Sequence, residues 1–269
     1  MAGHAAAVRW PVPLRAPLWT AFGRVFGVNF EEIRDPLSSF PSFQDFFVRR
    51  LVANARPLDD SSRSVVAPCD GSWGQSGRVE DGRLLQVKGR PYSLAALLGS
   101  RAEADGFEGG EFATLYLSPK DYHRFHVPCD ALLDRIRYLP GSLWPVNRAG
   151  VELVDGLFAE NERICAFFEL PTGGRIGLVA VGATVVGKIR LTFDVVESNL
   201  PKARCEVKDY APPLAFEKGA EWGRFLFGST LVLIASPGAL HLEKQPAGTP
   251  LRLGRAIGSL GSGVPDDDS

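Results

Sequence analysis

The tripeptide Gly228-Ser229-Thr230 lies within an apolar, strand-like run from Gly223 to Ile234, close to the C-terminus. Glycine weakens a strand and usually marks a bulge or a close approach to the backbone, which suggests that other atoms need access to the Gly228 carbonyl. The Ser229 hydroxyl can reach that carbonyl through a five-membered ring, and a nucleophile and a target in one chain need no bimolecular encounter. The chain could therefore cut itself here. The plainer interpretation is a β-bulge with a small serine beside it.

Two further segments supply a base and an acid. His123 and His126, two of the four histidines, stand three residues apart, and Asp70 follows a short apolar run and precedes Gly71. If the histidine segment is extended, residues three apart point to opposite sides, so the two imidazoles should serve different functions unless the backbone turns between them. Taken alone, Asp70-Gly71 is also typical of a hairpin turn, and a lone histidine is usually structural.

The order of these and other motifs resembles the phosphatidylserine decarboxylase family over residues 40–258. Each fragment is weak evidence, but the full ordered set is specific. Phe227 is a departure, because leucine is commoner before Gly-Ser-Thr in that family. The matching segments are Phe46-Phe47-Val48-Arg49, Pro68-Cys69-Asp70-Gly71, Lys88-Gly89 with Tyr92-Ser93-Leu94, Asp121-Tyr122-His123-Arg124-Phe125-His126, Pro140-Gly141-Ser142-Leu143, Val146-Asn147, Leu157-Phe158-Ala159-Glu160-Asn161-Glu162-Arg163, Val181-Gly182-Ala183-Thr184-Val185-Val186-Gly187 and Gly223-Arg224-Phe225.

The resemblance implies that the chain matures by serinolysis between Gly228 and Ser229, into residues 1–228 and 229–269. His126 removes the Ser229 proton while Asp70 orients the imidazole and favours its charged form, as in serine hydrolases. After β-elimination and loss of ammonia, Ser229 becomes a covalent pyruvoyl group. This pyruvate cofactor forms a Schiff base with the substrate amine and accepts electrons during decarboxylation. His123 is the candidate for assisting that step.

Composition sets limits on the partners of the chain. A net charge of −1 over 269 residues gives no indication of nucleic-acid binding. The hydrophobic residues, 45% of the chain, are enough to bury a sizeable core. The four cysteines show no Cys-x-x-Cys pair, so free thiols in a reducing compartment are expected. No metal site is expected, because the two close histidines lack the further ligands that zinc needs. No apolar run reaches the length of a membrane span. The longest runs, around Ile176 to Val186 and Leu231 to Ala235, are short, rich in β-branched residues and broken by glycine, so they are expected to be core strands.

The N-terminal segment mixes aromatic and basic residues. Pro17 fits a first helical position, from which Leu18, Trp19, Phe22, Val25 and Phe26 recur along one face. Such a face could lie in a lipid interface or simply cap the core. A second short helix is expected to begin at Ser42, to carry Phe43, Phe46 and Phe47 inward, and to be favoured by Asp45 near its start.

The remainder of the chain alternates short β-rich runs with glycine and proline turns. Resemblance and pattern together predict an α+β fold with a mostly antiparallel β core and N-terminal amphipathic helices. We expect residues 1–40 to form a membrane-interface segment, 41–258 the decarboxylase domain, and 259–269 a disordered acidic tail.

Three functions remain open at this point. The first is conversion of phosphatidylserine to phosphatidylethanolamine and CO2 by a peripheral enzyme on the cytoplasmic side of the cell membrane. The second is the same chemistry on a free amino acid such as tryptophan. The third is an uncleaved, non-catalytic binding protein. A hydrolase is disfavoured because Ser229 lacks the Gly-x-Ser-x-Gly elbow. The two cleavage fragments should stay associated, and the resemblance allows a homodimer.

Overall fold

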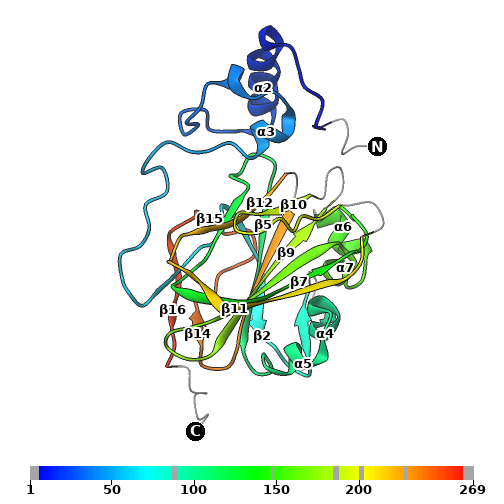
Figure 1. Ribbon diagram of the computed structural model, residues 1–269, viewed down its shortest axis with the longest axis vertical. Helices are drawn as coiled ribbons and strands as arrows, with labels where there is room; N and C mark the ends of the chain where they lie inside the picture. Colours follow the sequence, from blue (N-terminus) through cyan, green and yellow to red (C-terminus); the bar gives the residue numbers. More distant parts are fainter. Residues whose placement is uncertain are drawn as a thin grey trace.

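The computed structural model describes residues 6–86, 90–146, 148–183, 188–199, 203–226 and 229–262. The expectation of an α+β fold with a mostly antiparallel core is confirmed (Figure 1). An eight-stranded antiparallel sheet forms the centre of the molecule. Its order is β11 (Glu206–Phe216), β7 (Ala131–Leu139), β8 (Arg163–Glu169), β9 (Arg175–Gly182), β13 (Ser229–Ala235), β5 (Glu111–Leu117), β2 (Gly71–Arg78) and β15 (Pro250–Leu251).

Two three-stranded sheets cover one face of the large sheet, and their apolar residues join those of the large sheet in one core cluster. The first sheet contains β1 (Ser64–Val66), β16 (Ala256–Leu260) and β14 (Leu240–Leu242). The second contains β10 (Ile189–Leu191), β12 (Glu221–Phe225) and β6 (Arg124–His126).

Short helices and a hairpin cover the opposite face, where a second core cluster lies. These elements are β3 (Arg83–Leu85), β4 (Pro91–Ser93), α4 (Leu94–Leu98), α5 (Arg101–Asp105), α6 (Arg148–Leu153) and α7 (Leu157–Glu160).

Strand β13 alternates between the two cores, as the period of two in a strand requires. Leu231 and Leu233 belong to the first core, whereas Val232 and Ile234 belong to the second. The apolar runs around Ile176 and Leu231 were predicted to be core strands, and β9 and β13 confirm this.

The glycine before Ser229 does not interrupt a single strand, as the sequence pattern suggested. Strand β12 ends at Phe225 in the small sheet, and β13 begins at Ser229 in the large sheet. The apolar run is therefore divided between two strands of different sheets. Phe227 and Gly228 themselves lie outside the described residues.

The N-terminal helices form a separate layer above the small sheet with β10 and β12 (Figure 1). They are α2 (Val12–Phe26), a 3-10 turn (Leu37–Ser39) and α3 (Phe43–Phe47). Helix α3 begins as predicted, with a reciprocal capping box between Ser42 and Asp45 and with Phe46 and Phe47 fully buried.

Helix α2 corrects the predicted start at Pro17, because it begins at Val12 and contains Pro17. Its early start is possible because Pro13 lies in the first turn, where a missing N–H needs no intrahelical partner. The helix packs Trp19 against Phe46, with stacked rings 5.6 Å apart, whereas Val25 is 79% exposed. Only part of the predicted apolar face therefore packs against the rest of the fold.

The C-terminal boundary also needs correction. Strand β16 continues to Leu260 and pairs with both β1 and β14, so the ordered chain passes the expected boundary at residue 258. Most of the predicted acidic tail, residues 263–269, lies outside the described residues.

Candidate active site

Ser229 is the first residue of β13, in the middle of the large sheet. Its backbone is in register with Leu117 of β5 on one side and Gly182 of β9 on the other. Asn161, which is fully buried, donates from its amide nitrogen to the Gly182 carbonyl oxygen at 2.8 Å. The backbone at the candidate nucleophile is therefore held from both sides, and the strand beside it is fixed by a buried side chain.

His123 lies just before β6 and is fully buried. Its Nδ1 is 2.8 Å from the Asp121 carbonyl oxygen, which can only accept, so Nδ1 carries the proton. Nε2 then holds the lone pair, and among the described residues it has no hydrogen-bond partner. Burial, with a smaller contribution from Arg49, lowers the pKa of His123 to about 3. Near neutral pH, His123 is therefore a neutral base enclosed against the Phe47 ring, 3.9 Å away between centroids.

The same segment is tied to the strand that leads to the cleavage site. The backbone N–H of Phe225, at the end of β12, donates to the His123 carbonyl oxygen at 2.9 Å. This contact holds the His123 backbone to the strand that ends four residues before Ser229.

His126 has a similar tautomer but different neighbours. Its Nδ1 donates to the Gly219 carbonyl oxygen at 2.9 Å, which leaves a buried Nε2 lone pair without a partner in the described parts of the chain. Burial lowers its pKa, while the Gly219 carbonyl and the charges of Glu221 and Asp70 act in the opposite direction. The two imidazoles thus have different neighbours, and the prediction that they serve different functions stays a prediction.

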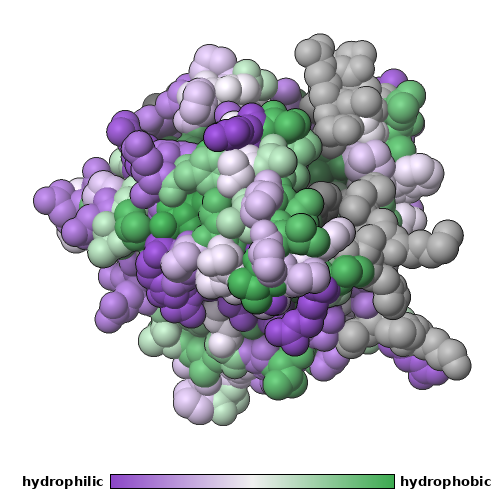
Figure 2. Space-filling model, turned by 90° about the horizontal axis from the view of Figure 1, so that it is seen from above, coloured by the Kyte–Doolittle hydropathy of each residue, from purple (hydrophilic) through white to green (hydrophobic). Residues whose placement is uncertain are grey.

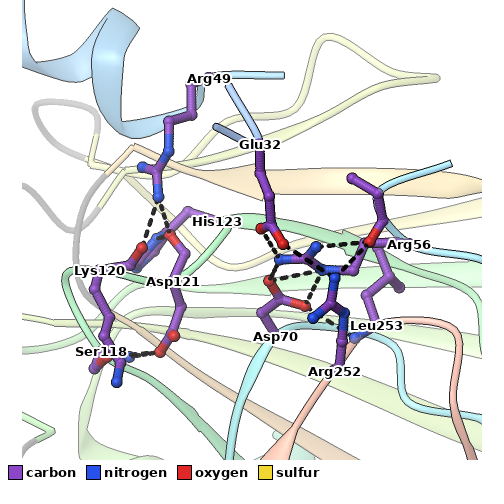
Figure 3. A network of polar contacts seen from close by, with 11 residues as sticks. Glu32, Arg49, Arg56, Asp70, Ser118, Lys120, Asp121, His123, Arg252 and Leu253 are labelled. Atoms are coloured by element: carbon purple, nitrogen blue, oxygen red, sulfur yellow. Dashed lines mark hydrogen bonds and ion pairs between the residues drawn. The ribbon is translucent and has the colours of Figure 1, made fainter. Parts of the chain in front are cut away.

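Among the described residues no hydrogen bond joins Asp70 to His126, although the resemblance assigns Asp70 the role of orienting this ring. Its carboxylate accepts from Arg56 Nε at 2.8 and 3.0 Å, from Arg56 Nη2 at 2.5 Å and from the Leu253 backbone N–H at 2.9 Å (Figure 3). Arg56 also donates to Glu32 at 2.8 Å. The group that orients the His126 ring is the Gly219 carbonyl, and Asp70 acts on that ring through its charge.

Arg56, Glu32 and Gly219 are the parts of this site that the sequence did not indicate. Arg56 stands 14 residues before Asp70 in a polar stretch without periodicity, and Glu32 and Gly219 are farther still from their partners. No local pattern could have revealed these pairings. Glu32 reaches Arg56 only when the N-terminal layer folds onto the sheets, and Gly219 reaches His126 only when β12 pairs with β6.

Two adjoining cavities lie between Asp70 and His126. One, of about 460 Å³, is lined by Asp70, Asp121 and Lys120; the other, of about 410 Å³, is lined by His126 and Gly219. Arg56 and Tyr122 line both cavities. Asp70, the candidate acid, and His126, the candidate base, thus line separate cavities that have Arg56 and Tyr122 in common.

Other residues of the expected motifs serve as supports or lie outside the described residues. Glu162 accepts from the Tyr138 hydroxyl, and Arg163 donates to the Leu97 and Ala96 carbonyl oxygens. Lys88 and Asn147 belong to the undescribed residues. In the described parts of the chain, no three His, Cys, Asp or Glu side chains cluster as a metal site, and no helix is long and apolar enough to cross a membrane.

The fold combines an antiparallel α+β core, a serine at the start of a central strand, and two imidazoles whose Nε2 atoms are buried and could exchange protons. Comparison with known proteins gives the family. The model of the phosphatidylserine decarboxylase family matches residues 43–259, so the chain belongs to this family.

Several relatives match over nearly their whole length. A phosphatidylserine decarboxylase proenzyme of Anaeromyxobacter sp. (strain K) is 45% identical over 258 residues, covering 94% of this chain and 91% of the relative. The proenzyme of Aliivibrio salmonicida (strain LFI1238) is 42% identical, covering 87% and 83%. That of Myxococcus xanthus (strain DK1622) is 36% identical, covering 96% and 92%.

Proposed function

We propose that this protein decarboxylates phosphatidylserine to phosphatidylethanolamine and CO2 after cutting itself between Gly228 and Ser229. The observation that supports this most is the position of Ser229, the first residue of a core strand that is hydrogen-bonded on both sides. A cut before such a residue leaves the downstream piece fixed in the sheet. The relatives are named as proenzymes of this activity, which agrees with a chain that must be cut before it functions.

Maturation begins with proton removal from Ser229. His126 is the proposed base, because the Gly219 carbonyl fixes its proton on Nδ1 and leaves Nε2 as an acceptor. The charge of Asp70 favours the imidazolium that forms, and it acts without a direct hydrogen bond.

The scission then balances within the chain. Ser229 Oγ forms an ester bond to the Gly228 carbonyl carbon while the peptide C–N bond breaks, and the nitrogen of residue 229 takes up the proton. In the β-elimination a base takes the Cα proton of residue 229 as the Cβ–Oγ bond breaks, which leaves a carboxylate at Gly228 and a Cα=Cβ double bond, a dehydroalanine, at residue 229. This residue tautomerises to an imine, and water replaces its nitrogen, so that ammonia leaves and a ketone remains.

The surroundings of residue 229 fit a pyruvoyl group. Its backbone is paired with β5 and β9. The segment bonded to β12 carries the buried, neutral imidazole of His123, whose Nε2 has no partner among the described residues. A pyruvoyl group there supplies an electrophilic ketone and an electron sink for loss of a carboxylate. His123 holds or returns the proton at Nε2, and the Phe47 ring against it keeps water from this atom.

The N-terminal layer is proposed to bring the enzyme to its lipid, on the cytoplasmic side of the cell membrane. Apolar side chains remain exposed on and beside α2, including Trp10 at 37%, Val12 at 57% and Phe26 at 45%. Hydrophobic surface lies among polar groups on the face of the molecule seen from above in Figure 2. Such a surface suits a lipid interface better than a buried contact within the chain.

Intact mass measurement tests this function. The purified protein should give two chains, one of residues 1–228 and one starting at residue 229 with a blocked end, and Ser229→Ala should give one uncut chain. The cut enzyme should release CO2 from phosphatidylserine in mixed micelles and not from free tryptophan. An unbroken wild-type chain would exclude the pyruvoyl mechanism, and turnover of tryptophan alone would exclude the lipid substrate.

A further inference from the structure

A cavity of about 400 Å³ lies where the N-terminal layer meets the small sheet of β6, β12 and β10. Figure 1 shows β10 and β12 just below α3. Arginines from both layers converge on this cavity, and Leu226, which follows β12, also lines it. The arginines are Arg34, Arg49, Arg50, Arg124, Arg190 and Arg224.

Three of these arginines form a row across the small sheet. Arg190 of β10 is in register with Arg224 of β12, and Arg224 is in register with Arg124 of β6. Directly opposed residues of antiparallel strands point to the same face, and like charges in these positions destabilise a sheet. A row of three cations therefore needs compensating negative charge.

The two outer arginines of the row have carboxylate partners, whereas the middle arginine has none among the described residues. Arg124 Nη1 donates to both carboxylate oxygens of Glu221, at 2.9 and 3.0 Å, and Arg190 donates twice to Glu197. Arg224 has no carboxylate partner among the described residues, and its buried Nε has no hydrogen bond. Burial lowers the pKa of Arg224, and the charge of neighbouring Arg124 adds to this effect.

Arg49 gives the cavity a second unpaired donor set. The residue is 4% exposed and its Nη2 donates to the Lys120 and Asp121 carbonyl oxygens at 2.6 and 3.1 Å (Figure 3). Its Nε and Nη1 are buried without a partner in the described part of the chain. A buried guanidinium with unsatisfied donors is costly unless a ligand completes it.

The carboxylates that line the cavity already have partners. Asp35 pairs with Arg34, and Asp45 accepts from Ser42 in the capping box. The unmatched donors therefore favour an anion from outside the chain, and a guanidinium fork matches the oxygens of a phosphate.

We propose that this cavity binds the phosphodiester of the phospholipid headgroup, through Arg224 and Arg49. This rests on the proposed function, because it assigns the phosphate to the substrate. A phosphodiester fits better than the serine carboxylate, since cations that hold the carboxylate would stabilise the ground state that decarboxylation must leave. The position also suits the reaction, because Leu226 precedes Ser229 by three residues and Arg49 contacts the segment that carries His123.

A direct binding test uses glycerophosphoglycerol, a phosphodiester with neither an amine nor an acyl chain. Titration into the wild-type protein, followed by phosphorus NMR, should show saturable binding that Arg224→Gln weakens about 10- to 100-fold, as expected for the loss of a charge-assisted contact. Arg101→Gln is the matched control, because it removes the same charge from a side chain that is 90% exposed on α5. No saturable binding by the wild type, or equal weakening in both variants, would overturn the site.

Kinetics separate the possible sources of the phosphate. Arg224→Gln should raise KM for phosphatidylserine by a similar factor, with a smaller change in kcat, and Arg224→Lys should restore part of the affinity. Lost diester binding with an unchanged KM would overturn the assignment to the substrate and identify a second anionic lipid. Inorganic phosphate that binds as tightly as the diester would overturn recognition of a diester. Each of these failures leaves the two-chain mass and lipid turnover of the wild type unchanged, so they are distinct from failure of the proposed function.

Discussion

The ion pair between Arg56 and Asp70 gives a quantitative prediction. Both side chains are nearly buried, at 12% and 8% exposure, and Arg56 also reaches Glu32 at 2.8 Å. Arg56→Gln leaves the Asp70 carboxylate with only the Leu253 N–H among the contacts described above. Breaking a buried pair from one side costs about 3–5 kcal/mol, and we take about 3 kcal/mol because Arg252 still pairs with Glu32 at 3.0 Å.

A double-mutant cycle in the uncut Ser229→Ala chain isolates the pair. In an Asp70→Asn background, Arg56→Gln removes mainly the Glu32 contact and should cost only about 1 kcal/mol, so the coupling is about 2 kcal/mol. Urea unfolding at pH 7 measures each free energy, and the single Arg56 variant should also lose about 6–12 °C in Tm. The exposed Arg101→Gln should change the free energy by less than about 0.5 kcal/mol. A coupling below about 0.5 kcal/mol would refute the reasoning, because the two residues would then act independently.

Two further predictions concern the histidines. His126→Ala should slow cutting by about 10²- to 10⁴-fold, and by more than His123→Ala does, as denaturing gels can measure. His123→Ala in a cut enzyme should lose turnover, which CO2 release measures. The reverse pattern would exchange the roles of the two histidines. The folded pKa of His123, about 3, is below the unfolded value of about 6.5, so the unfolded chain binds the proton first as the pH falls. Protonation of this group should therefore lower the free energy of unfolding by about 1.4 kcal/mol per pH unit as the pH falls from 6.5 towards 3. In the Ser229→Ala chain, His123→Gln should reduce this slope of the unfolding free energy against pH. An equal slope in both proteins would show that His123 is not held neutral by burial.

The sequence predicted those parts of the fold that depend on local pattern. The capping box at Ser42 and the core strands around Ile176 and Leu231 follow from side-chain chemistry within a few residues. The start of α2 was wrong because Pro17 looked like an entry signal, whereas Pro11 and Pro13 already occupy the positions where proline is tolerated. Local rules could not choose between these prolines.

The candidate site shows a different limit. Motif order indicated Ser229, His126 and His123, whose roles stay predictions, but it did not indicate Arg56 as the partner of Asp70. An aspartate carries no information about which distant cation will reach it, and the competition between Arg56 and His126 is decided only by the docking of the N-terminal layer. The row of three arginines was equally hidden, because it depends on the register of strands that are far apart in the chain.

The place of β13 between β5 and β9 has a consequence for the lifetime of the mature protein. If the chain is cut as proposed, the piece that starts at residue 229 also contributes β14, β15 and β16, which pair with β1 and β2 of the other piece or with each other. Unfolding after such a cut releases two polypeptides, so refolding requires them to associate and depends on their concentration. The shorter polypeptide has no core of its own. Each molecule can thus be assembled efficiently only once, and the durability of the working enzyme depends on how slowly it opens rather than on how well it refolds.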